Sequence, residues 1–396
     1  MLNLEPNQGD ASLIGWGGRK VTALTAALLN GTFIQGFELD DWHSEAPLHS
    51  NSIILPALLA ATQQAKAEGS HPTTSGRDFL LAVITGYEIG PRDGRSLWGT
   101  HVLLSGWHSG AVFGPPAAAA SVSKFYGLDA GTVEDTFGIA CTQACGLMLA
   151  QFESDIKRMH HGFAARNGFL AAVLARGGYV GIKQVFERQY GGFLKQFSSG
   201  NEKQPQYRLD ELTSELGSNW QTEGIRIKPY AAIAGTHPSI DYIQPLQEQH
   251  PERMKRFNEI KKINILLREA AFHHGGWKGT RPLTATGAQM IWRLIDLTDC
   301  KLHMDEGDSI GCQEVRIEFE DGTTLHHGVP NAFGVDPPSF NEDIVDKWRK
   351  LTEGTVPSQV VRQIEEMVVS LEEQGDAAVL CELLSQFSKS PLGALN

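Results

Sequence analysis

A short polar stretch between two apolar runs is the feature that most constrains how this chain can fold. Residues 38–50 carry four carboxylates and two histidines, and apolar, helix-like runs stand on both sides, at residues 26–29 and 53–61. Ionisable groups taken out of water must be paired, hydrogen-bonded or neutralised. A surface loop could carry the same residues without that cost. Because the flanking runs are typical of core helices, we predict a loop between two such helices, a common place for catalytic groups.

Length and charge exclude several classes of protein. The 396 residues are enough for two or more domains with a large core. The formal net charge of −12 argues against a nucleic-acid-binding protein, which usually carries a basic stripe. The sequence has no uninterrupted apolar run of about 18 residues, so we expect no membrane span. The first residues show neither a signal-peptide nor a transit-peptide pattern, and we expect a cytoplasmic protein.

The metal-binding residue types are not spaced as a metal site requires. Cys141 and Cys145 are four residues apart, which predicts that they share one face of a helix, but no second pair completes a zinc site. In the polar stretch, aspartate and histidine could bind a metal. No third ligand at a fixed spacing follows and no histidines stand four apart, so we predict reduced thiols and no metal. The other alternative is a solvated loop whose aspartate caps a helix.

Hydrophobic periodicity predicts a mainly helical chain. The helices are expected over residues 19–37, 53–68, 77–88, 133–150, 163–175, 183–188, 344–351, 356–371 and 377–387. Alternating or continuous apolar residues, as in strands, occur at residues 224–228, 262–267 and 315–320. Asp321-Gly322 predicts a hairpin turn. The predicted fold class is therefore mostly α. A large all-helical domain (residues 1–221 and 346–396) would be interrupted by a smaller α+β domain (residues 222–345).

His108 lies in a glycine-rich segment, residues 106–116, that leads into a run of alanines. Small residues at this density let backbones approach each other or a ligand. The spacing is not GxGxxG and no strand precedes it, which excludes a dinucleotide-binding loop. A lone histidine is more often structural than catalytic, but the small neighbours favour a functional role here.

Lys157 and Arg158 precede an apolar helix in an otherwise acidic protein. Helix N-termini bind anions through their free N–H groups and the helix dipole, so cations at this end do not stabilise the helix itself. The pattern predicts a carboxylate-binding site, and a basic surface turn is the alternative.

Lys228, with His237 downstream, stands at the end of a predicted strand near the domain boundary. Clefts between domains are usual ligand sites. Taken with Lys157, His49 and His108, these residues indicate a small polyanion as substrate, with histidine as proton donor or acceptor near neutral pH.

Several long segments resemble the MmgE/PrpD family and, within it, the fungal cis-aconitate decarboxylases that make itaconate. The segments that carry this resemblance are residues 38–56, 106–120, 138–146, 157–168, 190–194 and 228–237. The family fold is a large all-helical domain with a smaller α+β lid, usually in homodimers. The resemblance also implies that the chain needs no metal or organic cofactor. The 2-methylcitrate dehydratases belong to the same family and share this fold.

The resemblance implies a set of site residues between the two domains. It points to Asp40 or Asp41 with His49, to His108, and to two lysines, Lys157 and Lys228.

The acidic position is less sharply defined than the others. Trp42 follows Asp41 where the family has a threonine, so the acidic residue could also be Glu38.

The chemistry implied is a decarboxylation. The lysines would hold the carboxylates of cis-aconitate, and loss of one carboxylate as CO2 would leave negative charge on carbon. A protonated His49 or His108 would deliver a proton to that carbon. Two alternatives stay open: a 2-methylcitrate dehydratase-like lyase, and a truncated homologue that folds or dimerises but does not turn over.

Two departures from the family pattern favour the last alternative. Family members have further helices ahead of the segment at residues 31–41. After residues 288–290 the sequence passes to residues 291–296, which resemble a later part of the lid. An active-site tyrosine of the family then has no counterpart, and we expect a segment to be missing from the smaller domain.

Overall fold

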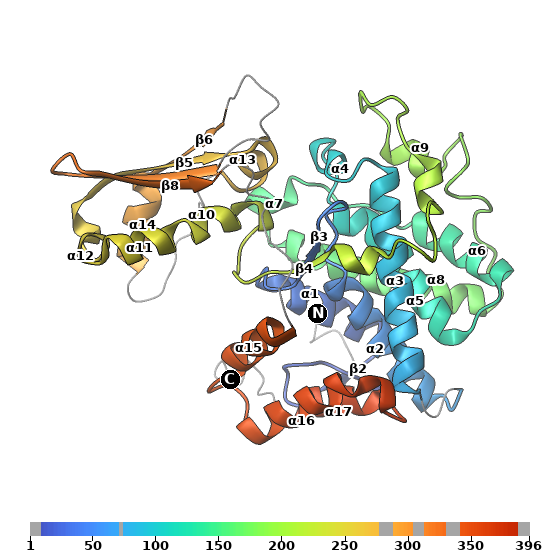
Figure 1. Cartoon of the computed structure of the whole chain (residues 1–396). Coiled ribbons are helices and arrows are strands. Elements are labelled where there is room, and N and C mark those ends of the chain that lie inside the picture. Colours follow the sequence, from blue (N-terminus) through green and yellow to red (C-terminus); the bar gives the residue numbers. More distant parts are fainter. Residues whose placement is uncertain (1–8, 71–73, 277–287, 304–312, 330–340, 387–396) are drawn as a thin grey trace. The chain divides into compact units, whose positions relative to one another are not determined.

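The computed structural model describes residues 9–70, 74–276, 288–303, 313–329 and 341–386 (Figure 1). Residue contacts divide the chain into two compact units, Met1–Ile227 with Pro338–Asn396, and Lys228–Pro337. The first unit is mainly helical, and the second contains a four-stranded sheet. The predicted fold class, mostly α with a smaller α+β part inserted into a helical one, is confirmed.

Five long helices form the core of the first unit. They are α1 (Ala23–Gly36), α2 (Asn51–Ala67), α3 (Gly76–Ser96), α5 (Ser109–Tyr126) and α8 (His160–Arg176). Helix α5 packs along α3 and α8, and α1 packs along α2 and α8. The shorter helices of this unit are α4 (His101–Leu104), α6 (Ala130–Cys141), α7 (Ala150–Glu153), α9 (Phe193–Phe197), α15 (Asn341–Thr352), α16 (Ser358–Val369) and α17 (Ala378–Gln386).

Two short antiparallel sheets complete the first unit. Strand β1 (Ala11–Ser12) pairs with β2 (Lys20–Val21), and β3 (Asp41–His43) pairs with β4 (Ile225–Ile227). Strand β3 lies inside the polar stretch, so this stretch is joined to a segment about 180 residues later in the chain.

Glycines let the helices that carry the site approach closely. A Cβ on Gly162 would lie 2.1 Å from the carbonyl oxygen of Leu28, so only glycine allows α8 to lie against α1 at this point. A Cβ on Gly114 would lie 2.7 Å from the Cβ of Ala164, at the contact of α5 with α8. These contacts bring the start of α8 next to α1, which leads into the polar stretch.

The second unit is built on a sheet of order β6-β5-β7-β8. Its strands are β5 (Ile260–Leu267), β6 (Thr298–Leu302), β7 (Gln313–Phe319) and β8 (Thr324–Val329). Strands β5 and β6 are parallel, and the other neighbours are antiparallel. Figure 1 shows α10 (His237–Asp241), α11 (Ile243–Gln249) and α12 (Pro251–Met254) along one side of the sheet. The unit also holds α13 (Glu269–Gly275) and α14 (Ala288–Leu297). The predicted hairpin at residues 321–322 is confirmed, and β6 was not predicted.

One predicted helix is too long and another is wrong. The helix expected over residues 133–150 ends at Cys141, and the following segment bonds across to another part of the chain: the N–H of Cys145 donates to Ala111 O, and that of Met148 to Gly106 O. Cys141 and Cys145 therefore do not share a helix face. Residues 183–188 form turns, with Gln184 in the left-handed region at φ 54°. Among the described residues, no helix combines the length and apolar character needed to cross a membrane.

Candidate active site

The polar stretch connects α1 to α2, as predicted, but it is not a solvated loop. Glu38, Asp40, Asp41 and His43 are all buried. Each of these side chains therefore needs a partner, and the partners come both from neighbouring residues and from distant parts of the first unit.

Glu38 is the carboxylate that meets the predicted cations. Its carboxylate accepts a hydrogen bond from Gln35 Nε2 at 2.9 Å and forms ion pairs with Lys157 and Arg158. Both cations lie on a 3₁₀ turn, η1 (Ile156–Met159), directly ahead of α8. Glu38 adopts φ 56°, a conformation that non-glycine residues rarely take and that persists where the surroundings enforce it. Two cations therefore meet the Glu38 carboxylate, with the Asp40 carboxylate within 4.8 Å of it.

The two aspartates have different partners. Asp40 lies 3.2 Å from His49 Nδ1. Asp41 Oδ1 accepts the N–H of Asn51 at 3.0 Å, at the first residue of α2, where helix N–H groups lack partners within the helix. The phenol of Tyr87 donates to Asn51 Oδ1. Burial raises the pKa of Tyr87 well above its usual value, and the charges of Asp41 and Asp40 raise it further.

Four histidines lie together beside these carboxylates, and we call them the histidine cluster: His49, His108, His160 and His161. The ring centroids are 5.1 Å apart for His49 and His161, 5.3 Å for His108 and His161, and 4.8 Å for His108 and His160. His161 Nδ1 is 2.7 Å from Ser52 Oγ. The opposite nitrogen faces Gly110, where a Cβ would lie only 2.1 Å from it.

Several nitrogens of the cluster are buried without a hydrogen-bond partner among the described residues. They are His108 Nδ1, His160 Nδ1, His161 Nε2 and also His49 Nδ1, which faces Asp40. Burial lowers the pKa of His108 and of His161 well below the usual range, and the neighbouring His161 and Lys157 lower that of His108 further. Burial lowers the pKa of His160 to about 4. These three rings are therefore neutral near pH 7 in the unliganded site.

Lys228 and His237 belong to the second unit. Lys228 directly follows β4, whose last residue, Ile227, is paired with Asp41. His237 opens α10, with its Nε2 3.2 Å from Ala232 O and its ring edge-on to Tyr230.

His43 has a structural role on the other side of the polar stretch. Its Nδ1 lies 3.3 Å from the N–H nitrogen of Glu45 and 3.1 Å from that of Ala46, so it accepts hydrogen bonds and carries no proton. Its Nε2 must then donate, and it lies 3.1 Å from Gln221 O. Burial lowers the pKa of His43 to about 4, which is consistent with this neutral tautomer.

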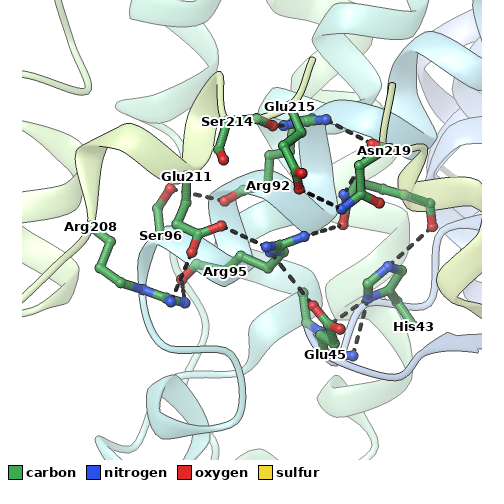
Figure 2. Close-up of polar contacts among 12 residues, drawn as sticks. His43, Glu45, Arg92, Arg95, Ser96, Arg208, Glu211, Ser214, Glu215 and Asn219 are labelled. Carbon is green, nitrogen blue, oxygen red and sulfur yellow. Dashed lines mark hydrogen bonds and ion pairs between the residues drawn. The ribbon is translucent and has the colours of Figure 1, made fainter. Parts of the chain in front are cut away.

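Figure 2 shows the polar contacts that fasten the segment before β4 to α3, which we call the α3 network. Arg92, fully buried, donates to Ser214 O at 2.6 Å and to Asn219 O at 3.0 Å, and its Nε lies 3.6 Å from Glu88. Arg95 pairs with Glu211 at 2.8 Å. Further members are Glu45, Ser96, Arg208 and Gln221.

A metal does not fit the acidic side of the site. Ligand atoms of Glu38, Asp40 and His49 lie within 4.8 Å of one another, the spacing that a metal ion needs. However, Lys157 and Arg158 already pair with Glu38 and would repel a further cation at this distance.

His160 and His161 were not predicted as site residues, although both lie in the segment of residues 157–168 that carries the family resemblance. The signal was present, since the two histidines directly follow Lys157-Arg158-Met159 and precede Gly162 at the start of a helix. What the sequence could not show is that this helix start lies next to His108 and to the end of α1.

The chain belongs to the MmgE/PrpD family. The MmgE/PrpD N-terminal domain matches residues 1–206, more than half of the sequence. The family and the relatives described next place the chain among decarboxylase-like lyases.

The relatives within this family are named as cis-aconitate decarboxylases or likened to them. The chain is 44% identical to the cis-aconitate decarboxylase-like protein oryM of Aspergillus oryzae, over 96% of this chain and 85% of that protein. It is 40% identical to the cis-aconitate decarboxylase of Aspergillus terreus, over 99% of this chain and 86% of the relative. The mouse cis-aconitate decarboxylase is 24% identical over 91% of this chain and 78% of its own length. The predicted likeness to the fungal cis-aconitate decarboxylases, which are carboxy-lyases, is confirmed.

The comparison also bears on the missing segment. The match to the Aspergillus terreus protein extends over 428 aligned positions, more than the 396 residues of this chain. That relative therefore has residues without a counterpart in this chain.

Proposed function

We propose that this chain is a cofactor-independent lyase that decarboxylates cis-aconitate to itaconate. The observation that carries the proposal is the buried histidine cluster, whose nitrogens include several with no hydrogen-bond partner in the described parts of the chain, next to a carboxylate that faces two cations. Buried polar atoms are normally hydrogen-bonded, so nitrogens kept without partners are suited to a polar ligand. The likeness to proteins named cis-aconitate decarboxylase supports the same reaction.

Substrate binding would use the two cations that pair with Glu38. Lys157 and Arg158 are the proposed ligands of substrate carboxylates, with Lys228 and His237 contributing as the resemblance implies. Loss of CO2 breaks a carbon–carbon bond, and the electron pair stays on the substrate as a carbanion next to its double bond. A proton must then be added to carbon, so each turnover consumes one proton.

The proton would come from His108 or His49, with Asp40 orienting His49 through their 3.2 Å contact. His108 is neutral in the unliganded site because burial lowers its pKa. A bound substrate carrying several carboxylates raises the pKa of nearby imidazoles, so substrate and proton would bind together. A positioned proton donor of this kind contributes about 10²–10⁴-fold to the rate.

The direct test is a proton NMR time course of the purified chain with cis-aconitate. We expect itaconate signals from the wild type and their loss in His108→Ala. His326→Ala is the matched control, since that side chain is well exposed in the second unit. In calorimetry, Lys157→Ala should abolish binding of cis-aconitate; unchanged binding would contradict the assignment of Lys157.

The two alternative functions, a 2-methylcitrate dehydratase-like lyase and a non-catalytic homologue, give different results in the same NMR assay. Dehydration of added methylcitrate without itaconate formation would indicate a 2-methylcitrate dehydratase-like lyase. No reaction with either compound would indicate a non-catalytic homologue, which the missing segment favours. We also propose a homodimer, as the family resemblance implies; light scattering on the purified chain would give twice the mass of 43.3 kDa.

A further inference from the structure

A cavity of about 320 Å³ lies beside the histidine cluster in the first unit. Its walls come from α5, from residues 143–146 and from η1 and α8. The polar part of the wall consists of Gln143, Cys145, His160, Arg166 and Asn167. The size is in the range of small-molecule sites.

The backbone around this cavity is held in place by specific bonds. Pro115 has no N–H, which leaves the carbonyl of Ala111 without its partner in α5, and this carbonyl accepts the N–H of Cys145 at 3.2 Å. The N–H of His108 donates to Gly146 O at 3.0 Å. Gly146 has φ 130°, and a Cβ there would lie 2.5 Å from that of Ala111. The loop that carries Cys145 is therefore preformed rather than shaped by a ligand.

Arg166 places a positive charge in this wall that no carboxylate of the described residues neutralises. Its Nε and Nη2 donate to Asn167 Oδ1, at 3.1 and 2.9 Å, and its guanidinium carbon lies 5.3 Å from the ring centroid of Phe163. An amide oxygen and an aromatic face hold the guanidinium in position but leave its charge available to an anion.

The second polar group is His160 Nδ1, which is buried and has no hydrogen-bond partner among the described residues. This atom lies 3.5 Å from the point where a Cβ on Gly146 would stand, and both residues line the cavity. The rest of the wall is largely apolar, with Pro115, Phe163 and Ala164. A cation, an unpartnered nitrogen and an apolar surface together match a small organic carboxylate.

We propose that this cavity is a binding site for a small organic carboxylate, distinct from the Glu38–Lys157 site. The carboxylate lies between Arg166 and His160, and the hydrocarbon part packs on Phe163 and Pro115. Binding itself does not depend on the reaction proposed above. The effect of binding on catalysis does depend on that reaction. The His160 ring lies 4.8 Å from that of His108, so an anion at His160 stabilises positive charge near the proposed proton donor.

Cys145 gives this proposal a local reporter. Cys145 is exposed and lines the cavity, whereas Cys141 and Cys381 are buried and Cys300 is half-buried in the second unit. Iodoacetamide labels accessible thiols, and peptide mass spectrometry gives the labelling rate of each cysteine separately. Succinate is a suitable probe because it is a small dicarboxylate.

We expect succinate to slow the labelling of Cys145 in a saturable way, by about ten-fold when its concentration is ten times its dissociation constant. The labelling of Cys300 should not change. Arg166→Gln should abolish the protection, and Arg166→Lys, which keeps the charge, should retain part of it. Labelling of Cys145 that is insensitive to succinate would overturn the proposal, and so would full protection in a folded Arg166→Gln variant.

Two controls separate this cavity from the proposed active site. Lys157→Ala should leave the protection by succinate unchanged, and its loss there would mean that succinate acts from the Glu38–Lys157 site. Inorganic phosphate should protect much less than succinate because it cannot use the apolar wall; equal protection would refute an organic ligand. The labelling assay requires no turnover, so protection without itaconate formation would refute the proposed reaction and leave the cavity site standing.

Discussion

Two polar regions of the first unit differ in how their side chains are paired. In the α3 network, Arg92 bonds two backbone carbonyls and lies near Glu88, and Arg95 pairs with Glu211 (Figure 2). In the histidine cluster, His108 and His160 each keep a buried nitrogen without a partner among the described residues.

The difference separates a structural role from a functional one. A buried polar atom without a partner costs roughly 1–3 kcal/mol, so several of them gathered on neighbouring side chains call for an explanation. The α3 network gives each of its charged side chains a partner of opposite charge or a backbone carbonyl, although Arg92 Nε, Arg208 Nε and Glu211 Oε2 make no hydrogen bond within the described residues. It holds residues 208–224, much of which is exposed and has little core of its own. The histidine cluster leaves nitrogens for a ligand, and the free energy of unfolding of the protein should depend much less on each of its side chains.

The largest expected effect is on the α3 network. Arg92→Met removes the cation beside the buried carboxylate of Glu88 and the donor to the carbonyls of Ser214 and Asn219, which should lower the free energy of unfolding by about 3–5 kcal/mol. Urea denaturation measures this loss. Arg316→Met is the control, since Arg316 is half-exposed on β7 and should cost little. Similar midpoints for the two variants would show that the α3 network does not stabilise the fold.

Acid should destabilise the protein through the buried histidines. The pKa of His43 and of His160 is lowered to about 4, and that of His108 and His161 is also lowered. Between pH 6.5 and 4 the unfolded chain binds protons that the folded chain does not, so stability falls as the pH falls through this window. Each such histidine contributes a slope of up to about 1.4 kcal/mol per pH unit.

Urea midpoints between pH 7 and 4.5 would measure this slope. In His43→Gln the change of the free energy of unfolding with pH should be smaller by the contribution of one histidine. A flat profile over this range would mean that the buried histidines are charged in the folded state.

His43 offers a smaller effect that can be divided between its two nitrogens. Asparagine keeps an acceptor near the position of Nδ1, for the N–H groups of Glu45 and Ala46, but does not reach Gln221. Glutamine keeps a donor near the position of Nε2, for Gln221 O. If the contact to Gln221 is the important one, His43→Gln should be more stable than His43→Asn by about 1 kcal/mol, the net value of one hydrogen bond.

Thermal unfolding of the two His43 variants would measure the difference, and activity adds a second readout. His43→Asn should lower kcat more than it changes KM, because strand β4 would lose its connection to the polar stretch while the cationic groups stay. Equal behaviour of the two variants would contradict this division.

The smallest stability change is expected in the histidine cluster. His160→Phe removes an unpartnered buried nitrogen and keeps an aromatic ring, so it should change the free energy of unfolding by less than about 1 kcal/mol or increase it. The same variant should lose the succinate protection of Cys145. A destabilisation as large as that of Arg92→Met would remove the distinction between the two regions.

Local patterns in the sequence predicted much of the fold. Apolar periodicity located α1, α2, α8 and the C-terminal helices, and alternation with an Asp-Gly turn located β7 and β8. These elements follow from side chains a few residues apart. The predicted helix over residues 133–150 failed because its second half bonds to residues 106–111, which no local pattern reveals.

For the candidate site, too, the sequence determined one part and the tertiary structure another. The sequence by itself determined which residues could carry charge and protons: the polar stretch, His108, and Lys157 with Arg158. Only the tertiary structure decided that Glu38 meets Lys157 across 119 positions of sequence, and that His160 and His161 join His49 and His108. The physical reason is that burial and pairing depend on which helices pack together, and this packing is decided by contacts such as that of Gly162 with Leu28.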